Sequence, residues 1–305
     1  MNKLAFLFMS ARPWSFFLSL ASVTTGSVVA YAAGTFHVGR FIVVLVGSVV
    51  MHAGINLLND YFDFKHGVDD VNVATSQYRS HPLVEGTMKP GQILAGAAVC
   101  YALAIAAAAY MAAVVGWPLA VIMAVGVLIS YFYTGEPVNF KRRGLGELSM
   151  FIATGPLMVT GAYFLQTGSW DNIGRVVLIS IPVGMWWSLI LSANNLRDID
   201  TDRKTLGRTV ASRIGRRGAV LFFASLAAVV YGGTLLDILL GVMPVWAFAV
   251  YVTLPRIIAL VRLFWTADRI PSNADPMTAQ VEIVYSLLLV ASFVLNRWVP
   301  LNLSL

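Results

Sequence analysis

Residues 41–63 read FIVVLVGSVVMHAGINLLNDYFD, a long apolar run that ends in acidic side chains. The part from Phe41 to Asn59 contains no Asp, Glu, Lys or Arg and is about as long as a helix must be to cross the hydrocarbon core of a bilayer. Its apolar residues are continuous and do not alternate with polar ones, which favours a helix over a membrane barrel strand. We therefore expect a membrane-spanning helix whose end carries carboxylates.

The composition of the whole chain supports this interpretation. Of 305 residues, 58% are apolar and only 12% are charged, whereas a soluble globular chain has about 25% charged residues. The mean hydropathy is +0.75. A single cysteine, Cys100, excludes a disulfide framework and a Cys-rich metal site. No Pro-, Gly- or Ser-rich linker divides the chain, so residues 1–305 are predicted to form one membrane domain.

The apolar segments predict an all-α, polytopic membrane protein with nine transmembrane helices. A Gly116-Trp117-Pro118 turn is expected to divide the longest apolar run. The predicted helices cover Trp14–Ala33, Phe41–Asn59, Gly91–Val114, Pro118–Tyr133, Leu148–Leu165, Val176–Asn194, Ala219–Leu240, Pro244–Phe264 and Glu282–Trp298.

The Lys and Arg residues predict the orientation of the bundle. With nine spans and an internal N-terminus, 17 of the 21 basic residues lie in internal segments. The N-terminus is therefore expected in the cytoplasm and the C-terminus outside. This distribution accounts for the net charge of +6 without a nucleic-acid partner, and the basic residues could also bind anionic lipid headgroups.

Two acidic motifs end helices that are expected to run in the same direction. Both begin N-x-x-x-D, and 138 residues separate Asn56 from Asn194 and Asp60 from Asp198. The two motifs should finish on the same membrane face, which indicates an internal repeat with two similar halves.

The spacing of each motif brings oxygen ligands together. On a helix, residues three or four positions apart share a face, so Asp60 should point with Asp63, and Asp198 with Asp202. Clustered carboxylates at helix C-termini are costly unless cations neutralise them. Hard oxygen ligands favour Mg²⁺, which binds through one or two carboxylates together with phosphate oxygens. The alternative is a solvated acidic collar, which is the more common explanation for a single motif.

Basic and aromatic side chains in the neighbouring segments could complete a phosphate site. The basic ones could grip phosphate oxygens, although a charge run at a membrane edge is also an orientation signal. They are Arg79, Lys141, Arg142 and Arg208. Tyr61 and Tyr133 could stabilise a cation or belong to the interfacial aromatic belt. We expect His52 to pack between helices, and Arg256 within the eighth span to face protein or a cavity.

The strings NLLNDYFD (56–63) and NNLRDIDTDRK (194–204) together resemble the UbiA superfamily of intramembrane prenyltransferases. The sequence is most similar to the branch that prenylates 1,4-dihydroxy-2-naphthoate for menaquinone synthesis. The strings that support this branch are ARP (11–13), YTG (133–135), GLGE (144–147) and GRT (207–209).

The resemblance implies transfer of a polyprenyl group from an allylic diphosphate to an aromatic acceptor, with loss of CO₂ to give demethylmenaquinone. It implies an active site on the cytoplasmic face of the plasma membrane, with catalytic roles for Asp60, Asp63, Asp198, Asp202, Lys141 and Arg79. It implies that Mg²⁺ is held by Asn56, Asp60, Asp63, Asn194, Asp198 and Asp202. It implies substrate contacts from Arg12, Asn56, Asn59, Tyr61, Tyr133, Arg142, Asn194 and Arg208.

Two positions depart from the family pattern, because Gly67 replaces a third acid and His81 stands where Arg is common. Asp69 or Asp70 would then have to supply the third carboxylate of the first motif. The alternative acceptors are 4-hydroxybenzoate, homogentisate, haem, chlorophyllide or a glycerol phosphate lipid. A cation-coupled transporter is the alternative from another class.

Overall fold

The computed structural model describes residues 3–67, 82–204 and 208–301. All regular secondary structure in these ranges is helical. The elements are α1 (Lys3–Ser10), η1 (Pro13–Ser15), α2 (Phe17–Ala32), α3 (Val38–Lys65), α5 (Pro90–Val115), α6 (Trp117–Phe132), η2 (Lys141–Arg143), α7 (Gly146–Ile152), η3 (Ala153–Leu157), α8 (Met158–Thr167), α9 (Ile173–Arg197), α10 (Ile199–Lys204), α11 (Val210–Leu239), η4 (Val245–Thr253), α12 (Leu254–Thr266) and α13 (Ala274–Trp298).

The predicted apolar segments all have helical counterparts in the described ranges. Within these ranges, seven helical segments are long and apolar enough to cross a membrane. An eighth span results if Phe6–Ser15 and Phe17–Ala32, which meet at a 50° bend, are taken together. The ninth counterpart, α6, has only 16 residues, which is short for a full crossing. The all-helical membrane architecture is confirmed, and the count of nine spans remains a prediction.

Several predicted helix limits were wrong because helices extend beyond the apolar stretches. The helix predicted to end at Asn59 continues to Lys65 and carries the whole first acidic motif. The last helix begins at Ala274, eight residues before the predicted start, because its first turns contain the polar residues Asp275, Thr278 and Gln280 and give no apolar signal. By contrast, the predicted turn at Gly116 is confirmed, since this glycine has φ 132° between α5 and α6.

Glycines let some helices approach more closely than side chains would allow. A Cβ atom built on Gly155 would lie 2.6 Å from the Ser180 carbonyl oxygen and 2.8 Å from Gly184 Cα. These atoms belong to the backbone and cannot move aside. The contact joins the π-helical turn η3, which contains Pro156, to α9.

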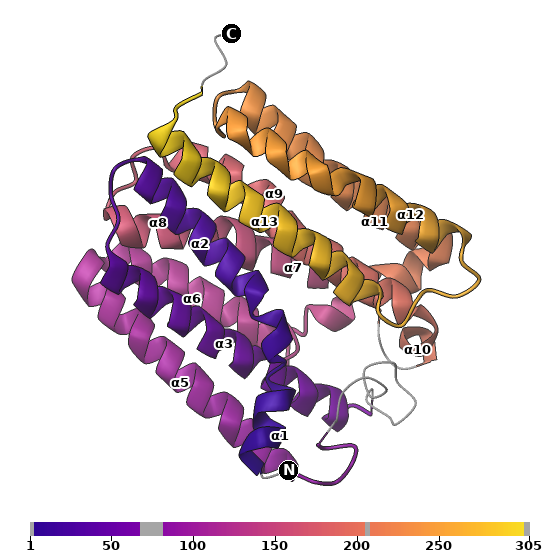
Figure 1. Cartoon of the computed structure of the whole chain (residues 1–305). Helices are drawn as coiled ribbons and strands as arrows, with labels where there is room; N and C mark the ends of the chain where they lie inside the picture. Colours follow the sequence, from indigo (N-terminus) through magenta and orange to yellow (C-terminus); the bar gives the residue numbers. More distant parts are fainter. Residues whose placement is uncertain (1–2, 68–81, 205–207, 302–305) are drawn as a thin grey trace.

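The helices form two groups. Figure 1 shows α2, α3, α5 and α6 gathered on one side, α11 and α12 on the other, and α13 running between α2 and that pair. The largest buried apolar cluster joins α9, α11, α12 and α13. A smaller cluster joins α3 to α5 and includes Phe6 and Leu7 of α1. The main cavity lies chiefly on the α2–α3–α6 side of this arrangement.

Candidate active site

A cavity of about 570 Å³ connects the acidic motifs to the apolar interior. Its lining includes Asn59 near one end and Val43 near the other, which are about 24 Å apart along α3 at 1.5 Å per residue. The charged and carboxamide side chains in the lining are Arg12, Asn56, Asn59, Lys141, Asn194, Asp275 and Gln280. Met111, Leu119 and neighbouring residues of α5 and α6 form an apolar part of the wall. The cavity therefore combines a charged end with an apolar tunnel.

The first motif lies on the last turns of α3, and its carboxylates are held by two different cations. Arg12 Nη2 donates to Asp60 Oδ1 at 2.6 Å. Lys141 Nζ donates to Asp63 Oδ2 at 2.6 Å and to Asn59 Oδ1 at 3.3 Å. Both aspartates are buried. The expected clustering of basic and acidic groups is thus present at this end of the cavity.

The bend between η1 and α2 brings Arg12 to the motif. Arg12 has φ 56° and ψ 60°, a left-handed conformation that turns the chain before Pro13. Asn56 Nδ2 donates to the Ala11 carbonyl at 2.8 Å and to Ser15 Oγ at 3.3 Å. The Asn56 amide nitrogen therefore docks the N-terminal segment on α3, and only its oxygen remains available as a ligand.

The second motif follows the end of α9 at Arg197. Asp198 N donates to the Asn194 carbonyl at 3.1 Å, and Asp202 N donates to the Asp198 carbonyl at 2.8 Å. The i to i−4 pattern thus continues into α10, which supports the predicted shared face of the three side chains. Thr209 Oγ1 donates to Asp202 Oδ2 at 3.0 Å.

Arg197 was not predicted as a site residue, although it organises the second motif. Its Nε and Nη2 donate to the two oxygens of Asp198 at 2.8 and 2.7 Å. It also contacts Asn194 Oδ1 and Asp275 Oδ1. Asp275 comes from the unpredicted first turn of α13, so no local sequence signal connected it to the motif 78 residues earlier.

Charged groups of both motifs affect the pKa of Asp202. Burial raises the pKa of Asp202 to about 6, and the negative charges of Asp198 and Asp63 act in the same direction. Lys141 and the hydrogen bond from Thr209 oppose this shift. Asp63 belongs to α3, so the charges of both motifs act on one carboxyl group.

The other predicted residues occupy different positions. Tyr133, Asn56 and Asn59 are buried on the cavity wall, and Asn194, which also lines the cavity, is partly exposed. Tyr61 packs with the α3–α5 cluster, Arg142 N donates to Asn139 Oδ1, and Arg208 is exposed. These three are absent from the described lining of the cavity. Arg79, His81, Asp69 and Asp70 lie outside the described residues.

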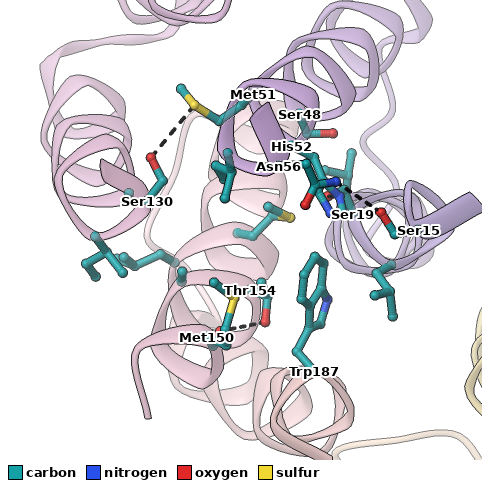
Figure 2. Close-up of a pocket in the computed structure, with 18 of the residues that line it drawn as sticks. Ser15, Ser19, Ser48, Met51, His52, Asn56, Ser130, Met150, Thr154 and Trp187 are labelled. Atoms are coloured by element: carbon teal, nitrogen blue, oxygen red, sulfur yellow. Dashed lines mark hydrogen bonds between the residues drawn. The ribbon is translucent and has the colours of Figure 1, made fainter. Parts of the chain in front are cut away.

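His52 lies deeper in the cavity, and Figure 2 shows it beside Asn56, Ser15 and Ser19 with Trp187 nearby. Ser15 Oγ donates to the Arg12 carbonyl, so it can only accept from His52, whose Nε2 lies 3.2 Å away. In the neutral imidazole, His52 Nδ1 then accepts from Ser19 Oγ at 2.9 Å. The imidazole also packs against Trp187 at 5.1 Å between ring centroids. The predicted packing role is confirmed, and this neutral ring also lines the cavity.

The exposed position of Arg256 corrects the expectation that it faces protein or a cavity. It belongs to α12, on the side turned away from the buried residues Ile257 and Leu260. Burial patterns on α12 repeat every three to four residues, and Arg256 falls between the buried positions.

The donor set fits Mg²⁺ shared with phosphate better than a metal held by protein alone. Within the described ranges, no group of three or more His, Cys, Asp or Glu side chains lies close enough to hold a metal ion. Mg²⁺ does not need such a cage, because it binds through one or two carboxylates, waters and substrate phosphates. Asp60, Asp63 and Asp202 supply hard oxygen donors beside Lys141 and Arg12, which suit phosphate oxygens.

Comparison with known proteins finds related chains. The UbiA prenyltransferase family model matches residues 19–298. The chain is 33% identical over 287 residues to 1,4-dihydroxy-2-naphthoate octaprenyltransferase of Bacillus subtilis (strain 168), covering 93% of this chain and 90% of that protein. It is 31% identical over 234 residues to human UbiA prenyltransferase domain-containing protein 1, covering 75% of this chain and 67% of that protein.

Solved structures share the fold at low sequence identity. The apo structure of a UbiA homolog from Aeropyrum pernix K1 superposes with a TM-score of 0.72 at 18% identity, covering 91% of this chain and 97% of that one. A UbiA homolog from Archaeoglobus fulgidus bound to GPP and Mg²⁺ gives a TM-score of 0.65 at 15% identity, covering 96% and 99%. From the family match, the sequence relatives and the common fold, the chain belongs to the UbiA prenyltransferase family.

Proposed function

We propose that this protein transfers a polyprenyl group from an allylic diphosphate to 1,4-dihydroxy-2-naphthoate in the plasma membrane, with its active site on the cytoplasmic face. The observation that carries the proposal is the continuity of the cavity, which joins a rim containing Arg12 and Lys141 to an apolar tunnel. These two cations are paired with Asp60 and Asp63 of the first motif. A substrate with a charged head and a long hydrocarbon tail fits both parts.

Asp60, Asp63 and Asp202 would hold Mg²⁺, with oxygen atoms of Asn56, Asn59, Asn194 and Asp198 nearby in the two motifs. When bound, Mg²⁺ supplies positive charge that stabilises the departing diphosphate. Lys141 and Arg12 line the same end of the cavity and can donate hydrogen bonds to the diphosphate oxygens that the metal does not hold. Arg79, Arg142 and Arg208 are assigned to the outer part of this anion site, and Tyr61 to its aromatic surroundings.

The chain's own residues also protect the reacting carbon. The C1–O bond to diphosphate breaks while a bond forms between C1 and a ring carbon of the acceptor, and the acceptor then loses CO₂. The apolar lining from Met111 and Leu119 keeps bulk water from the prenyl group. Tyr133 on the cavity wall presents an aromatic side chain near Lys141 and Asp63.

The acceptor assignment rests on the Bacillus subtilis relative and on the polar side of the tunnel. That relative is named a 1,4-dihydroxy-2-naphthoate octaprenyltransferase, and it aligns with 93% of this chain. In the cavity, His52 and Asn56 follow one another on one face of α3 opposite Trp187. A flat ring with oxygen substituents would find an aromatic surface and hydrogen-bonding groups there.

The deciding experiment supplies the protein, purified in lipid nanodiscs, with Mg²⁺, an allylic polyprenyl diphosphate and one acceptor at a time. The acceptors are 1,4-dihydroxy-2-naphthoate, 4-hydroxybenzoate and homogentisate, and products are identified by mass spectrometry. We expect a decarboxylated prenyl naphthoquinol with the first acceptor, and no product after chelation of Mg²⁺. Product with another acceptor alone would replace the acceptor assignment. No diphosphate release with any acceptor, together with cation flux in liposomes, would overturn the enzyme proposal.

A further inference from the structure

The carboxylates of the two motifs are paired with basic side chains that differ in their exposure to solvent. Arg12 holds Asp60, Lys141 holds Asp63, and Arg197 holds Asp198. The side chain of Arg12 is 24% exposed and that of Lys141 is 22% exposed, whereas that of Arg197 is only 2% exposed. Arg12 and Lys141 line the cavity, and Arg197 does not appear in its described lining.

Arg197 is fixed by its other contacts. It binds both oxygens of Asp198, and it also donates to Asn194, to Asp275 and to the Ser272 carbonyl. These bonds fasten the end of α9 to the start of α13. Moving the guanidinium into the cavity would break all of these bonds and leave the half-buried carboxylates of Asp198 and Asp275 without this donor, which is unfavourable.

Arg12 and Lys141 can change partners at lower cost. Each already borders the space where a diphosphate would lie, and each is long and partly solvated. A diphosphate offers them several charged oxygens in place of the carboxylates that they contact here. The same exchange would free the carboxylates of Asp60 and Asp63 to bind another cation.

We propose that Arg12 and Lys141 are exchangeable counter-ions of the first motif. They neutralise Asp60 and Asp63 before substrate enters, and they move to the diphosphate when it binds, which releases both carboxylates to Mg²⁺. Arg197 remains on Asp198 throughout. The two motifs are therefore unequal, and the first is the motif whose carboxylates become available on binding. This inference rests on the proposed function.

Cooperative binding of metal and diphosphate follows from this exchange. Without diphosphate, Mg²⁺ must compete with a cation that already lies 2.6 Å from each carboxylate of the first motif. With diphosphate present, the competing cations have another anion, so each ligand should strengthen binding of the other by the same factor. Removing one basic charge should raise the affinity for metal alone and weaken this mutual strengthening.

The test uses Mn²⁺ as a paramagnetic probe for the Mg²⁺ site and inorganic pyrophosphate as the anion. Free Mn²⁺ is measured by electron paramagnetic resonance for the protein in nanodiscs, with and without pyrophosphate, after correction for the metal–pyrophosphate complex formed without protein. The variants are Arg12→Gln and Lys141→Gln. Arg175→Gln is the matched control, because Arg175 is exposed and donates to the Val242 carbonyl far from both motifs in the fold.

In the wild-type protein, pyrophosphate should tighten Mn²⁺ binding. Arg12→Gln and Lys141→Gln should bind Mn²⁺ alone about tenfold more tightly, since a neighbouring opposite charge changes carboxylate affinity for a cation by at least that factor. Pyrophosphate should then tighten Mn²⁺ binding much less than in wild type. Arg175→Gln should match wild type in both measurements.

Two results would overturn the inference while leaving the proposed function in place. In one, pyrophosphate tightens Mn²⁺ binding to Arg12→Gln and to Lys141→Gln as strongly as it does in the wild-type protein. The other is an Arg197→Gln protein that remains folded and gains Mn²⁺ affinity as strongly as Arg12→Gln. By contrast, a wild-type protein that binds neither Mn²⁺ nor pyrophosphate would contradict the proposed function itself.

Discussion

Lys141 Nζ lies 2.6 Å from Asp63 Oδ2 and 3.3 Å from Asn59 Oδ1, and so joins the segment after α6 to the last turns of α3. A single long side chain with a positive charge thereby contacts two predicted site residues of the first motif, the metal ligand Asp63 and the substrate contact Asn59. Its charge also lowers the pKa of Asp202, against the larger effect of burial, so the same amine acts on both motifs.

Replacing Lys141 with Met should reduce prenyl transfer without unfolding the protein. The substitution keeps a long apolar side chain but removes the charge that would stabilise departing diphosphate. We expect kcat to fall by about 10²-fold, as for other donors placed at a developing anion. Lys204→Met is the matched control, since Lys204 is exposed on α10. Equal loss of activity in both variants would show that Lys141 has no special position.

Trp187 should affect binding of the aromatic acceptor, and Trp186 should affect the stability of the fold. Trp187 lines the cavity and faces His52, whereas Trp186 is buried among Tyr231 and Tyr285. Trp187→Leu should raise the KM for the aromatic acceptor by roughly three- to tenfold, which is the scale of one aromatic pair. The KM for the prenyl diphosphate should change less. An unchanged acceptor KM would place the acceptor elsewhere.

Trp186→Ala is the complementary variant. Loss of a large buried side chain should cost about 3–5 kcal/mol of stability, measured by denaturant or thermal unfolding in detergent. Protein that remains folded should keep the wild-type KM for the acceptor. The two adjacent tryptophans are therefore expected to have different roles. On α9, Trp187 points into the cavity, where it can contact the acceptor, and Trp186 points into the core formed with α11 and α13, where it stabilises the fold.

Close packing at Gly155 should be intolerant of even one methyl group. A Cβ atom there would approach the Ser180 carbonyl to 2.6 Å, and neither that carbonyl nor Gly184 can move without shifting α9. Gly155→Ala should therefore lower stability by about 1–3 kcal/mol, the usual cost of overpacking. Gly232→Ala is the control, because nothing lies within 4 Å of a Cβ at that exposed helical position. Similar unfolding midpoints for the two variants would contradict this account.

Features set by short stretches of sequence could be predicted, whereas contacts between segments far apart in the chain could not. The acidic motifs, their helical spacing and the break at Gly116 all follow from short-range patterns. The contacts of Arg12 with Asp60 and of Arg197 with Asp275 join segments 48 and 78 residues apart, and they depend on a backbone bend and on tertiary packing. The early start of α13 was missed for a related reason, since its polar first turns gave no apolar signal.

Asn195 lies beside the second motif, but its contacts indicate a structural role and not a catalytic one. Its Nδ2 donates to Glu147 Oε1 at 2.9 Å, and both side chains are buried. Asn195→Ala would leave the carboxyl oxygen of Glu147 without this donor, at a cost of about 1–3 kcal/mol. Asn273→Ala is the control, because Asn273 is exposed and makes no side-chain cap bond at α13.

The expected result is a lower unfolding midpoint for Asn195→Ala and an unchanged one for Asn273→Ala. Pyrophosphate-dependent Mn²⁺ binding should persist in both variants, since Asn195 points to Glu147 and is absent from the described cavity lining. Asn194, the preceding residue, lines the cavity, so Asn194→Ala should weaken that binding instead. Loss of metal binding in Asn195→Ala at full stability would show that Glu147 and Asn195 belong to the site.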